Sequence, residues 1–212
     1  MGGRGASSGG VAGGGGISVN AQTTSLVSAR EGKRAEVDQT LAVLRQVQQQ
    51  YGLTADLNDV QLATLDKKNQ GVLAYYDING NLAMNESYFD TQKMNGVYDS
   101  SVQSGFHPSR GDKTGIEAVA AHEMGHRLSD VAAQKLGYGD WQLDKVSNEI
   151  VRRASKATGA SNVSSFRSAI SGYAIHNNAE TVAEAFADVY CNGKNARRES
   201  QAVVSELNKI LR

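Results

Sequence analysis

Apolar side chains recur at helical spacing along much of this chain. Leu41, Leu44, Val47 and Tyr51 lie three or four residues apart, and Gly52 follows them as a stop signal. This pattern predicts a helix over about 28–50. Similar patterns predict further helices over about 114–136, 141–157, 162–170, 179–191 and 196–211.

Two of these helices carry recognisable end signals. Thr114 and Glu117 have the spacing of a capping box, in which a hydroxyl and a carboxylate satisfy backbone N–H groups at the helix start. Gly137 follows that helix as a C-terminal glycine. Asn178 is expected to cap the helix over 179–191, and Asn192 with the glycine after it to end that helix.

The apolar residues of 71–89 do not follow the helical spacing, and their pattern predicts strands. Apolar and β-prone residues flank Asn79-Gly80, a strong tight-turn signal, so we expect a hairpin with strands near 72–78 and 81–85. Residues 96–113 contain three glycines and a proline and are expected to form a loop. The sum is an α+β domain, mostly helical with a small β-sheet.

The first 25 residues differ in composition from the rest. They are rich in glycine and serine and have few apolar side chains, so they predict a disordered tail before a single folded domain over 26–212. A chain of 212 residues, 40% of them apolar, is long enough to bury one sizeable core.

Charge and cysteine content exclude several classes of function. Lys+Arg and Asp+Glu number 22 each, which gives no electrostatic footprint for nucleic acid or an anionic membrane. The single cysteine, Cys191, rules out an intramolecular disulfide, and its apolar surroundings favour a buried structural thiol over a nucleophile. No signal peptide or membrane span is visible, so the expected location is cytoplasmic or virion-associated.

The candidate chemistry centres on residues 122–126, which read HEMGH. On a helix His122 and His126 share a face, so both imidazoles can bind one zinc ion at about 2.0–2.1 Å. Glu123 is then placed to reach a zinc-activated water as general base. The alternative is a pair of surface histidines on an ordinary helix, which the small apolar neighbours disfavour.

A catalytic zinc site needs a third protein ligand. A downstream histidine in the pattern HExxHxxGxxH is excluded, because Ser129 and Ala132 stand at the two diagnostic positions. Glu180 and Glu184 lie one turn apart among small apolar residues. We interpret Glu180 as the ligand and Glu184 as the hydrogen-bond acceptor that orients a ligand histidine. Asp188, one turn further on, is expected on a solvated helix face, an alternative that stays open for Glu184.

Together these motifs resemble the catalytic domain of anthrax lethal factor and its relatives, a branch of the glutamate-zincin metallopeptidases. The resemblance covers about residues 70–195 and depends on HEMGH together with the run from Gly172 to Tyr190, GYAIHNNAETVAEAFADVY. It implies a zincin-like fold, one Zn²⁺ ion and hydrolysis of peptide bonds in a protein or peptide substrate. These 212 residues show no counterpart of the large binding domains of lethal factor, so we do not expect its choice of substrate to transfer.

The resemblance also implies a role for Tyr173. Its phenol would stabilise the oxyanion of a tetrahedral intermediate, and its position in a loop before the ligand helix agrees with this. Core packing is the alternative. In the resembled fold an edge strand borders the cleft, so Leu82, Ala83 and Met84 are our candidates for pairing with an extended substrate.

The other two histidines, His107 and His176, are expected to be exposed loop residues more readily than substrate contacts. Two rival functions remain open. One is a bacteriophage or mobile-element structural or self-processing protein with a zincin-like domain, because the glycine-rich start resembles such proteins in composition. The other is a toxin or effector that cleaves a host protein.

Overall fold

The structure is a computed structural model that describes residues 5–8, 22–53, 60–66, 69, 71–77, 81–139 and 143–212. At residues 5–8 and 143 it describes the backbone alone. The α-helices are α1 Arg34–Tyr51, α2 Thr91–Gln103, α3 Gly115–Lys135, α4 Leu143–Thr158, α5 Val163–Ser168, α6 Asn178–Asn192 and α7 Arg198–Leu211. Short 3-10 helices are η1 Ser28–Glu31, η3 Glu86–Tyr88, η5 Tyr173–Ile175 and η6 Gly193–Asn195.

One small mixed sheet accompanies the helices, which confirms the expected α+β class. Its strands lie in the order β1-β4-β5-β3-β2. Only β3 and β5 run parallel, and the other neighbours are antiparallel. The strands are β1 Gly5–Ser8, β2 Gln22–Ser25, β3 Val60–Thr64, β4 Val72–Tyr76 and β5 Leu82–Asn85.

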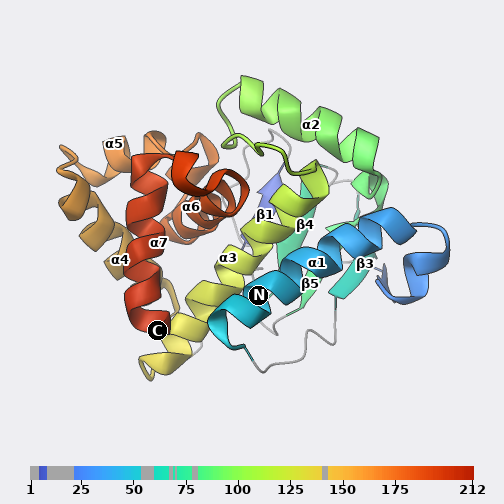
Figure 1. Cartoon of the computed structure of the whole chain (residues 1–212), viewed down its shortest axis with the longest axis horizontal. Coiled ribbons are helices and arrows are strands. Elements are labelled where there is room, and N and C mark those ends of the chain that lie inside the picture. Colours follow the sequence, from blue (N-terminus) through green and yellow to red (C-terminus); the bar gives the residue numbers. More distant parts are fainter. Residues whose placement is uncertain are drawn as a thin grey trace.

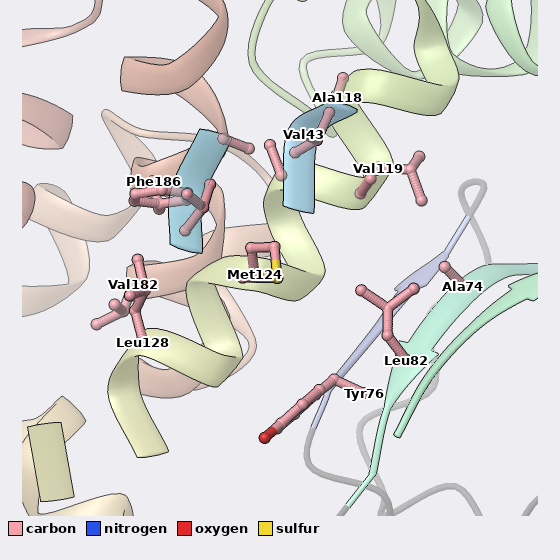
Figure 2. Close-up of a cluster of buried hydrophobic side chains, with 14 of the residues drawn as sticks. Val43, Ala74, Tyr76, Leu82, Ala118, Val119, Met124, Leu128, Val182 and Phe186 are labelled. Carbon is pink, nitrogen blue, oxygen red and sulfur yellow. The ribbon is translucent and has the colours of Figure 1, made fainter. Parts of the chain in front are cut away.

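Helix α3 runs through the middle of the molecule (Figure 1). Helices α4, α6 and α7 contact it on one side, and α1 and the sheet contact it on the other. Figure 2 shows apolar side chains of α3, α6 and the sheet gathered around this central helix, among them Met124, Leu128 and Val182. Because it is packed on both sides, α3 is buried over most of its circumference, and the histidines of HEMGH are buried with it.

The predicted hairpin is confirmed as the β4–β5 pair, in which Ala74 lies opposite Met84 and Tyr76 opposite Leu82. Asn79 and Gly80, which predicted the turn, lie outside the described residues. The proposed substrate-binding edge is wrong for Leu82, Ala83 and Met84. Strand β5 pairs with β3 on one side and β4 on the other, so its backbone is hydrogen-bonded within the sheet and is not free to pair with a substrate. All three side chains are buried in the sheet.

The predicted loop over 96–113 is wrong at its start, because α2 extends to Gln103. The side chain of Asp90 caps this helix by accepting the N–H of Lys93 at 2.9 Å. Met94 and Tyr98 then bury one face of the helix. Gly96 lies on the exposed side, and burial of the other face outweighs the cost of about 1 kcal/mol that a mid-helix glycine carries.

The predicted disordered tail is also wrong in two places, at β1 and β2. The side chains of Gln22–Ser25 are exposed, so composition correctly indicates that they bury little. Backbone pairing with β3 orders this segment instead, and the adjacent Leu26 is fully buried. Strand β1 pairs with β4 in the same way. The rest of residues 1–25 lies outside the described part.

Other predicted boundaries hold to within a few residues. The helix expected over 28–50 is η1 followed by α1, and the helix expected from 196 begins at Arg198. The helix end at Gly137 is confirmed by its positive φ of 74°. The cap of α6 is Asn177 and not Asn178, because it is the Asn177 side chain that accepts the N–H of Glu180.

Candidate metal centre

Helix α3 supplies both histidines of the candidate centre. Thr114 and Glu117 form the predicted capping box: the Thr114 hydroxyl accepts the Glu117 N–H at 3.2 Å, and the Glu117 carboxylate accepts the Thr114 N–H at 2.8 Å. Two turns beyond this start, His122 and His126 are each 2% exposed, with ring centroids 5.0 Å apart. The helix therefore holds two imidazoles side by side in the interior, as the motif predicts.

Gly125 allows a second helix to approach this pair closely. A Cβ atom at Gly125 would lie 2.7 Å from the Cα of Ala183 in α6 and 3.1 Å from the Cβ of Phe186. No ordinary side chain fits there. The glycine of HEMGH thus sets the distance between the two helices that carry the candidate ligands.

Helix α6 supplies the third group, Glu180, in its first turn. The Asn177 cap fixes this turn, and the carboxylate is buried at 4% exposure. Its Oε2 lies 3.1 Å from Nε2 of His122 and 3.3 Å from Nε2 of His126. The two Nε2 atoms are 3.2 Å apart. The sequence prediction that these three side chains meet is confirmed.

Oε2 of Glu180 and the Nε2 atoms of His122 and His126 form a triangle whose size suits a metal ion. Donors bound tetrahedrally at about 2.0–2.1 Å stand about 3.3 Å from one another, which is the edge of such a tetrahedron. The observed sides of 3.1–3.3 Å match one face of it. Among the described residues, this buried group of His122, His126 and Glu180 could hold a metal ion.

Glu184, one turn after Glu180, is buried and faces His122. Its Oε1 accepts the Nδ1–H of His122 at 2.8 Å, and its Oε2 accepts the hydroxyl of Ser171 at 2.7 Å. An ionised carboxylate only accepts, so this bond places the proton of a neutral His122 on Nδ1 and leaves the Nε2 lone pair for the metal side. The alternative of a solvated Glu184 is thereby excluded.

Burial opposes the charged forms of Glu180, Glu184 and His122, whereas their mutual attraction and hydrogen bonds favour these forms. Burial raises the pKa of Glu180, but attraction to His126 and hydrogen bonds from both histidines outweigh it and lower the pKa to about 2. The pKa of Glu184 is likewise lowered, because His107 and His122 outweigh its burial. Burial lowers the pKa of His122, and hydrogen bonds to Glu180 and Glu184 raise it well above its usual value. Both carboxylates are therefore anionic, which suits a bound cation.

The two predicted catalytic residues lie beside the triangle. Glu123 is fully buried on α3, and its charge helps to raise the pKa of His122. Tyr173 stands in η5, just ahead of α6, with its ring centroid 5.8 Å from that of His122 and the planes inclined by 28°. The structure thus brings both residues to the centre.

His107 corrects the sequence interpretation most clearly. It was expected to be exposed, but it is 1% exposed and its Nδ1–H donates to Oε1 of Glu184 at 3.0 Å. Its ring packs edge-on against those of His122 and Tyr173. The only sign in the sequence was the neighbouring Phe106, an aromatic residue in a glycine-rich loop. His176 is half-buried against Tyr173.

The structure corrects the expectation for Asp188 and supports that of an unreactive thiol at Cys191. Asp188 does not lie on a solvated face; it is buried and accepts the side-chain N–H of Asn192 at 2.8 Å and the backbone N–H of Arg197 at 2.9 Å. It therefore ties the end of α6 to the start of α7. Cys191 is half-buried, and burial with nearby carboxylates raises the pKa of its thiol to about 12. A thiol with that pKa is a poor nucleophile.

The described helices include none with the length and apolar character needed to cross a bilayer. Comparisons of the chain with protein-family models, with curated proteins and with solved structures give no match.

Proposed function

We propose that this chain is a zinc-dependent endopeptidase with His122, His126 and Glu180 as the metal ligands. The observation that carries the proposal is the buried triangle of two Nε2 atoms and one carboxylate oxygen, with sides of 3.1–3.3 Å. Two imidazoles and one carboxylate are the ligand set of catalytic zinc sites, which leave a fourth position open. The cluster has three members among the described residues, and this favours catalysis over a closed structural site.

The chain's own groups have distinct tasks in the proposed reaction. Zinc, when bound, would supply a water of lowered pKa and polarise the peptide carbonyl. Glu123, adjacent to His122 and buried, takes a proton from the attacking water and returns it to the leaving amine. Tyr173 donates its phenol O–H to the developing oxyanion. Glu184 holds His122 in the tautomer that presents Nε2.

The resemblance to the lethal factor-like zincins supports the same proposal. The three ligands that it implies, His122, His126 and Glu180, form one buried group, although they come from two helices far apart in sequence. A bacteriophage processing protease and a host-directed effector would share this site. The proposed chemistry therefore applies to the self-processing and effector roles, which the substrate distinguishes, whereas a closed four-ligand site would favour a purely structural role.

Metal analysis and peptide-library cleavage test the proposal together. We expect about one zinc ion per chain, with cleavage by the native protein and none by Glu123→Gln, which should retain its metal. Glu149→Gln changes a glutamate on α4 whose side chain is 40% exposed, and it serves as the control, with hydrolysis unchanged. Full hydrolysis by the Glu123→Gln variant, or a native protein that binds no metal, would refute the assignment.

A further inference from the structure

A pair of backbone hydrogen bonds brings His107 into the centre. The N–H of Gly172 donates to the carbonyl of Gly105 at 2.8 Å, and the N–H of Tyr173 donates to the carbonyl of Phe106 at 2.9 Å. The contact is tight, since a Cβ on Gly172 would lie 3.2 Å from the Gly105 oxygen. The loop after α2 is thus fastened to the segment that precedes α6.

The fastened loop places His107 between two functional groups. Its Nδ1–H donates to the same Oε1 of Glu184 that accepts the Nδ1–H of His122. Its ring also packs edge-on against Tyr173, with centroids 5.5 Å apart. On its other side the ring stacks on Tyr98 of α2 at 5.2 Å, nearly parallel at 6°. These contacts leave the His107 ring little freedom to rotate.

Glu184 is consequently held at both oxygens by residues that are not metal ligands. Ser171 donates to Oε2 and His107 to Oε1, so the carboxylate has a fixed plane in which to receive His122. A carboxylate on a long side chain with only one of these partners would be free to turn about its last bond. Orientation of His122 depends on that plane, because the bond from its Nδ1–H is directional.

We propose that His107 is a positioning residue of the metal centre: through Glu184 it orients His122, and by ring packing it holds Tyr173 beside the ligands. The inference rests on the metal-binding part of the proposed function. It predicts that His107 matters for metal affinity without being a ligand itself. A residue that merely fills space next to Tyr98 would matter only for stability.

Two substitutions separate these roles. His107→Leu fills the space but has no N–H for Glu184. His107→Asn is smaller, yet its side-chain nitrogen stands as many bonds from Cα as Nδ1 does and can donate to Glu184. His176→Leu is the matched control, because this half-buried histidine also packs on Tyr173, with ring centroids 5.0 Å apart, but forms no hydrogen bond with Glu184 among the described contacts.

The measurement is the affinity for Zn²⁺ in competition with a chromogenic chelator, with the absorption spectrum of the Co²⁺-substituted protein as a second readout. We expect His107→Leu to lose about tenfold or more in affinity and to alter the Co²⁺ bands, as is typical when a partner behind a ligand is lost. His107→Asn should recover most of that loss, and His176→Leu should bind as the native protein does.

Melting of the metal-free proteins identifies variants that fail to fold. A folded His107→Leu with native affinity and native Co²⁺ bands would overturn the inference, as would an Asn variant no better than the Leu variant at equal stability. Native protein that binds zinc but cleaves no peptide would instead refute the peptidase proposal and leave the positioning role standing.

Discussion

Replacing Gly125 with alanine tests whether the contact between α3 and α6 governs both stability and metal binding. The new Cβ would lie 2.7 Å from Ala183 Cα, whereas ordinary contacts begin at 3.4 Å, so the helices must part by about 0.7 Å. Overpacking of this kind costs about 1–3 kcal/mol. Alanine also raises helix propensity by about 1 kcal/mol, which offsets part of that cost.

Gly96→Ala isolates the packing contribution. Gly96 is also a mid-helix glycine, but a Cβ there meets nothing within 4 Å, so only the gain in propensity applies. The two variants should therefore differ by about 1–3 kcal/mol in unfolding free energy. For a chain of this length that corresponds to a melting temperature about 2–12 °C lower for Gly125→Ala than for Gly96→Ala.

The assay is thermal unfolding by circular dichroism without metal, followed by zinc titration. Because Glu180 lies one turn before Ala183 on α6, parting the helices also moves the carboxylate away from both histidines. We expect Gly125→Ala to bind zinc more weakly and Gly96→Ala to bind it normally. Equal melting temperatures for the two variants would refute the packing argument, and native affinity in Gly125→Ala would refute its link to the ligands.

Three further predictions follow from the site. His126→Ala should lose zinc binding at micromolar metal, measured by metal analysis after dialysis; full occupancy would remove His126 from the ligand set. In the metal-free protein, the lowered pKa of Glu180 stabilises the folded state above about pH 4.3, and this contribution is lost as the pH falls toward 2. The raised pKa of His122 stabilises the folded state below about pH 6.5, and this contribution is lost as the pH rises. Its melting temperature should therefore peak between these values, and a steady rise to pH 8 would contradict the assigned charges. Cys191, with a thiol pKa of about 12, should react with iodoacetamide at pH 8 far more slowly than free cysteine does, as mass spectrometry can show.

The candidate ligand set could be predicted from sequence because its members lie in two short helical motifs. A spacing of four residues on a helix fixes a shared face, so the sequence alone pairs His122 with His126 and Glu180 with Glu184. The local sequence pattern does not show that α6 packs against α3. The small apolar residues around Glu180 and the resemblance to a family both pointed to a facing helix, and the structure brings His122, His126 and Glu180 together.

The sequence interpretation failed where the position of a residue depends on partners outside its own helix, strand or loop. His107 stands in a loop whose own residues predict exposure, and hydrogen bonds to the segment at Gly172 bury it. Asp188 is buried because Arg197, beyond the end of its own helix, supplies an N–H. Strands β1 and β2 have strand conformation only because β4 and β3 offer backbone partners. None of these partners is visible from local periodicity.

Strand β1 covers an edge of β4 that would otherwise be open to outside peptides. It pairs with β4 on the side away from β5, with Gly5 opposite Tyr76 and Ala6 opposite Tyr75. It also contacts α3, the helix that carries the two histidines (Figure 1). A peptide that adds to β4 must first displace it, and a segment of the same chain competes at an effective concentration on the order of millimolar. Removal of the first nine residues would thus open the edge of β4 to outside peptides without changing His122, His126 or Glu180.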